Sequence, residues 1–151
     1  MHNGWCDARR GNISRRQCGR VPPDRKPFLP MKLHLATTSA NVITALGDGW
    51  VRVGQVEYRG NLVLTADTVT AGWAPAGFEA LAESDYAGLL ATRPDVVLLG
   101  TGQALRFPHP RLTRALTAAQ VGVEVMDTAA ACRTFNVLAA EGRRVTAALI
   151  L

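Results

Sequence analysis

From residue 41 onward, the first half of the chain alternates short apolar runs with glycine-containing turns. The apolar runs lie at residues 42–46, 50–53, 56–58 and 62–65, and the turns at 47–49, 54–55 and 59–61. Short apolar runs joined by two or three turn residues are typical of β-hairpins. We therefore expect closely spaced antiparallel strands, followed by a loop over residues 67–77 that returns across the sheet.

In the second half of the chain the spacing of the apolar residues changes, and it predicts helices that alternate with strands. The expected helices cover residues 83–91, 110–120 and 128–140, and the expected strands cover 96–99, 123–126 and 144–150. The continuous apolar run at 96–99 is typical of a strand buried on both faces. Asp127 or Thr128 is suited to cap the last helix. The apolar face of that helix consists of Ala131, Cys132, Phe135, Leu138 and Ala139.

This order of elements predicts an α/β (α+β) fold. We expect a mixed sheet, with antiparallel hairpins in the N-terminal half of the chain and β-α-β units in the C-terminal half. We expect a smaller β layer on one side of that sheet and helices on the other. Residues 31–151 have the length of a single globular domain.

Residues 1–30 differ from the rest of the chain in charge and composition. They contain seven basic and two acidic residues, whereas residues 31–151 contain ten of each, so the whole net charge of +5 lies in this segment. A segment rich in Arg and Gly without apolar periodicity is typical of disorder. Either translation starts at Met31, which is the simpler interpretation, or residues 1–30 form a flexible basic tail.

Composition and charge narrow the class of protein. No apolar run approaches the ~18 residues that a membrane-spanning helix needs, so a transmembrane protein is excluded, while peripheral association stays open. Because residues 31–151 are electrically neutral and have no basic stripe, we expect no nucleic-acid binding by the folded domain. The three cysteines form no CxxC pair or zinc-spaced Cys/His cluster. We therefore expect a cytoplasmic protein with no metal and no cofactor.

The first candidate site is the turn Gly100-Thr101-Gly102 at the end of a buried strand. Successive N–H groups of such a turn can hold an anion or a small molecule. The alternative is that the glycines only form a tight turn. The third glycine of a dinucleotide fingerprint and the Gly-Lys-Ser/Thr of a P-loop are both absent here.

The second candidate site is the pair Arg133 and Asn136, which share one side of the last helix, off its apolar face. Arg133 offers donors for a carboxylate or phosphate, and Asn136 could orient a polar group. The structural alternative is an Arg133 ion pair and an Asn136 that ties down a loop. We expect Cys132 to be a buried thiol rather than a nucleophile, and no catalytic set can be placed.

Several motifs together resemble a family of small uncharacterised domains. They are Leu99-Gly100-Thr101-Gly102, Val125-Met126-Asp127-Thr128, Cys132-Arg133-Thr134-Phe135-Asn136-Val137-Leu138 and Glu141-Gly142-Arg143. The family includes mitochondrial complex I assembly factor 3 and the adipogenesis-associated domain protein. The resemblance implies a three-layer β/β/α fold, and it makes the glycine turn and the Arg133–Asn136 edge candidates for a shared cleft. Family members usually carry Tyr where this chain has Phe135.

The resemblance also leads to the expected function. The mitochondrial relative is a non-catalytic partner in assembly of a respiratory complex, and bacterial members have no established activity. We therefore expect a non-enzymatic domain that binds an unknown protein partner, with assembly of a respiratory or other membrane complex as its role. The alternative is a small-molecule or anion-binding domain, enzymatic or not, that uses Gly100, Thr101, Gly102, Arg133 and Asn136.

Overall fold

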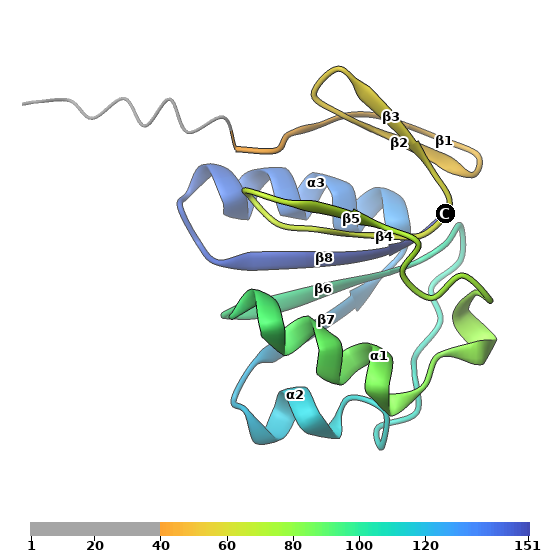
Figure 1. Ribbon diagram of the computed structural model, residues 1–151, viewed down its shortest axis with the longest axis vertical. Helices are drawn as coiled ribbons and strands as arrows, with labels where there is room; N and C mark the ends of the chain where they lie inside the picture. Colours follow the sequence, from red (N-terminus) through yellow and green to blue (C-terminus); the bar gives the residue numbers. More distant parts are fainter. Residues whose placement is uncertain (1–39) are drawn as a thin grey trace, which may run out of the picture. The chain divides into compact units, whose positions relative to one another are not determined.

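The computed structural model describes residues 40–151, so the predictions for residues 1–30 lie outside the described part. The chain begins there with a three-stranded antiparallel sheet in the order β1-β2-β3 (Figure 1). Its strands are β1 (Ile43–Gly47), β2 (Trp50–Val53) and β3 (Val56–Arg59). Gly49 and Gly54 occupy the hairpin turns with φ angles of 72° and 59°, which glycine adopts without steric cost.

A second, five-stranded sheet forms the centre of the domain, in the order β5-β4-β8-β6-β7. Its strands are β4 (Leu62–Leu64), β5 (Val69–Ala71), β6 (Val96–Thr101), β7 (Gly122–Met126) and β8 (Val145–Ile150). β8 is antiparallel to β4 and parallel to β6, and all of its residues are buried. The predicted mixed sheet is therefore confirmed: it contains the β4–β5 hairpin and the parallel strands β6, β7 and β8, while the hairpins of β1, β2 and β3 form the separate small sheet.

One face of the five-stranded sheet carries the helix α3 (Thr128–Ala140) and the three-stranded sheet. Ala131, Cys132 and Phe135 of α3 share one apolar cluster with Val51 and Val53 of β2. The predicted apolar face of α3 is thus the buried one. That face packs in the same cluster as the small sheet, so α3 lies on the same side of the central sheet as the small sheet. The expectation that the helices lie on the opposite side is therefore wrong for α3.

The other face is covered by short helices (Figure 1). They are the 3₁₀ turns η1 (Phe78–Ala80) and η2 (Leu89–Thr92) and the helices α1 (Glu83–Gly88) and α2 (Arg114–Ala118). Leu81, Tyr86, Leu89 and Leu116 pack there against Val97 and Leu99 of β6. The three layers of the β/β/α fold are present.

Two of the expected elements are wrong in part. The expected loop at 67–77 contains β5, which pairs with β4 across a turn where the hydroxyl groups of Thr65 and Thr68 are 2.9 Å apart. The expected helix at 110–120 is helical only over Arg114–Ala118, because residues 110–113 form turns. Among the residues described, no helix has the length and apolarity needed to cross a membrane.

Candidate functional site

Gly100 lies where the end of β6 passes closest to the start of α3. A Cβ at this position would come within 3.1 Å of both the Cα and the Oγ1 of Thr128, and within 3.0 Å of Leu149. Contacts this short require the neighbours to move. Glycine at position 100 therefore allows the first turn of α3 to pack directly on the sheet.

Thr101 is completely buried and organises the loop that follows it. Its hydroxyl donates to the carbonyl of Ala104 at 2.8 Å and accepts the Arg106 N–H at 3.0 Å. Its carbonyl accepts from the Arg106 side chain, with Nη2 at 2.9 Å. Thr101, a residue of the predicted ligand site, thus holds residues 102–106 in place.

Gly102 has a φ angle of 95° and exchanges two hydrogen bonds with Thr128. Its N–H donates to the Thr128 hydroxyl at 2.8 Å, and its carbonyl accepts the Thr128 N–H at 2.9 Å. The same hydroxyl donates to the carbonyl of Ile150 at 2.6 Å, while Asp127 caps the helix by accepting the Ala130 N–H. The Gly102 amide, proposed as an anion donor, is therefore already paired within the fold.

Arg133 and Asn136 lie on the side of α3 that faces β1. Arg133 is exposed, and it forms no ion pair with any residue of the described range 40–151. The Asn136 side chain accepts the Ile43 N–H at 2.9 Å and donates to the Ile43 carbonyl at 2.8 Å. Asn136 thus makes the two bonds that a neighbouring strand would make, and it ties β1 to α3.

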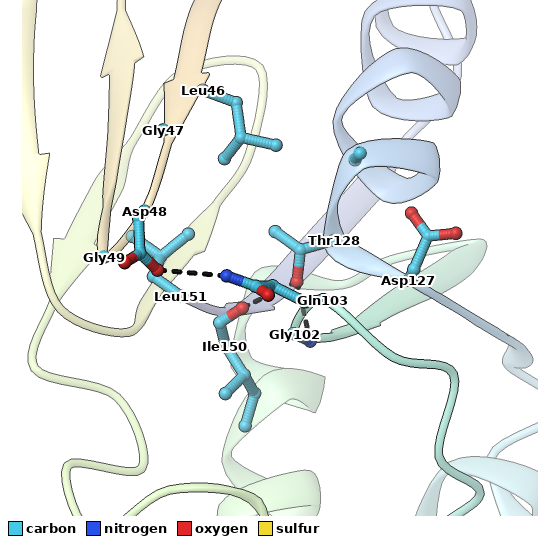
Figure 2. A pocket seen from close by; sticks show the side chains of 11 residues that line it. Leu46, Gly47, Asp48, Gly49, Gly102, Gln103, Asp127, Thr128, Ile150 and Leu151 are labelled. Atoms are coloured by element: carbon cyan, nitrogen blue, oxygen red, sulfur yellow. Dashed lines mark hydrogen bonds between the residues drawn. The ribbon is translucent and has the colours of Figure 1, made fainter.

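The predicted site residues divide between two adjoining hollows. A cleft of about 250 Å³ is lined by Gly102 together with the turn at residues 47–49 and the start of α3 (Figure 2). A shallower hollow of about 180 Å³ is lined by Arg133 and Asn136. Leu46 and Ala129 line both, whereas Gly100 and Thr101 line neither. The glycine turn and the Arg133–Asn136 edge therefore both lie along the boundary between β1 and α3, but they do not form one pocket.

The loop after Gly102 presents exposed apolar side chains that no sequence pattern predicted. Phe107 is 72% exposed and Leu105 is 51% exposed. Arg106 between them stacks on the Phe78 ring at 4.5 Å and forms an ion pair with Glu79. A single Phe in a proline-rich loop gives no periodic signal, so only the structure shows that this loop is anchored.

Two buried groups have a raised pKa, and neither lies beside a partner that would activate it. Burial raises the pKa of the Cys132 thiol to about 11, although Arg133 lowers it slightly. The thiol is therefore protonated at neutral pH, in line with the prediction of a buried thiol. Burial, and then the charge of Asp85, raise the pKa of Tyr86 to about 12. Within residues 40–151, no three His, Cys, Asp or Glu side chains are grouped as metal ligands.

The comparisons with known proteins agree on one family. A family model described as protein of unknown function (DUF498/DUF598) matches residues 43–150. The chain is 37% identical over 93 residues to the mouse protein named NADH dehydrogenase [ubiquinone] 1 alpha subcomplex assembly factor 3, covering 60% of this chain and 50% of that protein. The chain thus spans about half the length of the curated assembly factors it matches.

Two bacterial proteins match over more of their length. An uncharacterised protein from Rhodobacter capsulatus is 37% identical over 108 residues, which cover 72% of this chain and 82% of that protein. A crystal structure of a protein from Bordetella parapertussis matches with a TM-score of 0.68 and 41% identity, covering 76% of this chain and 98% of that one. The resemblance expected from the sequence motifs is therefore confirmed.

Proposed function

The chain belongs to the DUF498/DUF598 family of proteins of unknown function, and from this we propose that it is a non-catalytic protein-binding domain that assists assembly of a respiratory or other membrane complex. The relatives named as assembly factors support this role. Their names refer to NADH dehydrogenase, so subunits of that complex are the first partners to test.

The single observation that supports protein binding best is the anchored loop with exposed Leu105 and Phe107. Arg106 is held by the Thr101 carbonyl, the Phe78 ring and Glu79, so the loop is fixed before any partner arrives. A loop that is already anchored loses little backbone freedom on binding, and aromatic residues are common energetic centres of interfaces.

The alternative of a small-molecule or anion-binding domain has less support. The Gly102 amide is bonded to Thr128, and the Asn136 amide is bonded to Ile43. Of the residues proposed for that site, Arg133 keeps a side chain without an ion pair in the described part of the chain. We also propose a cytoplasmic location with peripheral association to the membrane that holds the complex.

The role can be tested by expressing the tagged full chain at its natural level and measuring which respiratory subunits copurify. We expect near-stoichiometric recovery of one partner, and about a tenfold loss for Phe107→Ser. Val56→Ser on β3 is the matched control, because Val56 is also exposed, at 54%, and lies in a different part of the fold.

Deletion of the gene should also lower the amount of assembled complex on native gels. Unchanged complex levels together with a bait that returns alone would refute the assembly role. Equal losses for Phe107→Ser and Val56→Ser would show that the loop is not the binding surface.

A further inference from the structure

The two hollows described above adjoin each other between β1 and α3. We call the pair the β1–α3 groove; it comprises the cleft of about 250 Å³ beside the turn at 47–49 and the hollow of about 180 Å³ beside Arg133. Leu46 and Ala129 line both parts, so the two hollows meet there. In the described part of the chain β1 pairs with β2 alone, so its other edge faces α3.

Polar bonds limit the groove at both ends. At one end the two Asn136 bonds join α3 to Ile43. At the other end the Gln103 amide donates to the Asp48 carboxylate at 3.1 Å, which connects the small sheet to the loop after β6 (Figure 2). The walls between these points are therefore held at a defined separation.

The groove has opposite charges at its two ends. Asp48 and Asp127 line the larger cleft, and no Lys or Arg lines it. The hydrogen-bond donors to these carboxylates are the neutral Gln103 amide and the Ala130 N–H, so both charges stay uncompensated. Arg133 lines the smaller hollow with its charge free of any ion pair in residues 40–151.

The size of the groove favours single side chains over a whole small molecule. Ligand pockets usually have volumes of about 300–1,000 Å³, and both parts are smaller. Leu46, Ala129 and Leu151 give the larger part an apolar lining. An extended peptide segment lying along an edge strand, with a few side chains in pockets, is an established way in which proteins bind one another.

We propose that the β1–α3 groove binds an extended segment of a protein partner. The segment places an apolar side chain between Leu46 and Ala129, a basic side chain near Asp48 and an acidic side chain near Arg133. This inference rests on the proposed protein-binding function, but it concerns a surface separate from Phe107. It gives Arg133 the carboxylate-binding role that its residue type and position on the helix predict.

The geometry of α3 gives an approximate spacing for the two charged side chains. Asp127 lines the larger cleft together with Asp48, and it precedes Arg133 by six residues on α3, which corresponds to an axial rise of about 9 Å. An extended chain advances about 3.3 Å per residue and alternates its side chains between two faces, so the basic and acidic residues of the partner should be two or four positions apart. A test library therefore consists of capped peptides of about eight residues with Lys and Glu two to four positions apart, in both orders, and with Leu or Ala between them.

Binding is measured by fluorescence anisotropy with the full chain. We expect the best Leu peptide to bind about tenfold more tightly than its Ala counterpart. Arg133→Glu should weaken that peptide about tenfold, and exchanging its Glu for Lys should restore binding to this variant. Ala129→Leu should also weaken binding, because the larger side chain occupies the groove.

Arg143→Glu is the matched control, since Arg143 is exposed and lines a different hollow. Thermal unfolding of each variant must match the wild type, which separates lost binding from lost folding. No peptide binding with a Kd below about 1 mM, or equal binding by wild type, Ala129→Leu and Arg133→Glu, overturns the proposal.

The proposed function and the groove can fail separately. If the peptides do not bind while Phe107→Ser still loses the copurified partner, the groove proposal is wrong and the assembly role stands. If the peptides bind with the expected charge dependence but gene deletion leaves the respiratory complex unchanged, the groove stands and the assembly role is wrong.

Discussion

The two faces of the five-stranded sheet are stabilised in different ways. On the α3 face, side chains bond to backbone atoms far away in sequence: Thr128 to Ile150, and Asn136 to Ile43. On the α1/α2 face, surface ion pairs join Arg106 to Glu79 and Arg114 to Glu83. The fully buried Tyr86 hydroxyl on that face has no hydrogen-bond partner among the described residues.

This difference indicates what each face can be used for. Directional bonds to the backbone hold α3 and β1 at fixed positions, which is required of a groove that must fit a partner. Exposed ion pairs contribute little to stability. The exposed loop side chains Leu105 and Phe107 on the α1/α2 face are free to contact other proteins. The following predictions test this contrast from the largest expected effect to the smallest.

Substitution of Gly100 should be the most damaging change on the α3 face. Gly100→Val places side-chain atoms against Thr128 and Leu149, so we expect the free energy of unfolding to fall by about 3 kcal/mol in urea denaturation. Gly88→Ala on the other face is the matched control. A Cβ at residue 88 meets nothing within 4 Å, and this helical position should gain about 0.5 kcal/mol. Similar losses for both variants would contradict the close packing assigned to Gly100.

Asn136 and Arg133 should differ sharply, although they lie on the same side of α3. Asn136→Ala removes both bonds to Ile43 and should lower the free energy of unfolding by about 2 kcal/mol, because half-buried backbone groups lose their partners. Arg133→Ala should change it by less than about 0.5 kcal/mol. Amide hydrogen exchange at Ile43 should accelerate only in Asn136→Ala. Equal stability losses would mean that Arg133 also supports the fold.

On the α1/α2 face, removal of a polar atom should stabilise the protein. Tyr86→Phe deletes a buried hydroxyl without a partner among the described residues, so we expect a gain of about 1 kcal/mol in the free energy of unfolding. Tyr58→Phe serves as the control, since Tyr58 is only partly buried and should be nearly neutral. A loss of stability in Tyr86→Phe would show that its hydroxyl is hydrogen-bonded in solution.

Each apolar cluster contains one buried acid, so alkaline pH reports on the two faces separately. The pKa of Cys132 on the α3 face is raised from 9.0 to about 11, and that of Tyr86 on the other face from 10.0 to about 12. Above its ordinary pKa each group loses its proton in the unfolded chain but keeps it in the folded one. Stability should therefore fall with rising pH, between pH 9 and 11 for Cys132 and between pH 10 and 12 for Tyr86.

These windows can be measured by urea denaturation from about pH 8 to pH 12. Cys132→Ala should remove the part of the slope that begins near pH 9, and Tyr86→Phe the part that begins near pH 10. At neutral pH neither titration contributes a slope. A wild-type stability that stays constant across this range would contradict the assigned burial of both groups.

Short-range sequence patterns predicted the elements that are stabilised by residues close to one another in the sequence. Turn glycines marked the hairpins of the small sheet, and the capping residue Asp127 with the spacing of Ala131, Cys132 and Phe135 defined α3. β5 was missed because it has only three residues and exists through its pairing with β4. The side of the sheet on which α3 lies depends on packing against residues distant in the sequence, and the spacing of apolar residues along the helix carries no information about that packing.

For the candidate site, the residue types indicated which positions matter, but the sequence did not indicate the hydrogen-bond partners of these residues. The glycines at 100 and 102 do mark the closest approach of strand and helix, but the engagement of the Gly102 amide by Thr128 joins residues that are 26 apart. The partner of Asn136 is 93 residues away, at Ile43. Phe107 carried no signal, because its exposure follows from how Arg106 is anchored.

The strand order has a consequence for how the protein is made. β8 is the last strand in the described sequence, yet it lies between β4 and β6 and pairs with both. During synthesis on the ribosome, the β4–β5 hairpin and the β6–β7 pair cannot join until residues 145–150 have emerged. The nascent chain therefore exposes two unfinished sheet edges at this stage, and such edges are sites of aggregation. Translation speed and ribosome-associated chaperones should consequently affect the yield of this domain through its final strand.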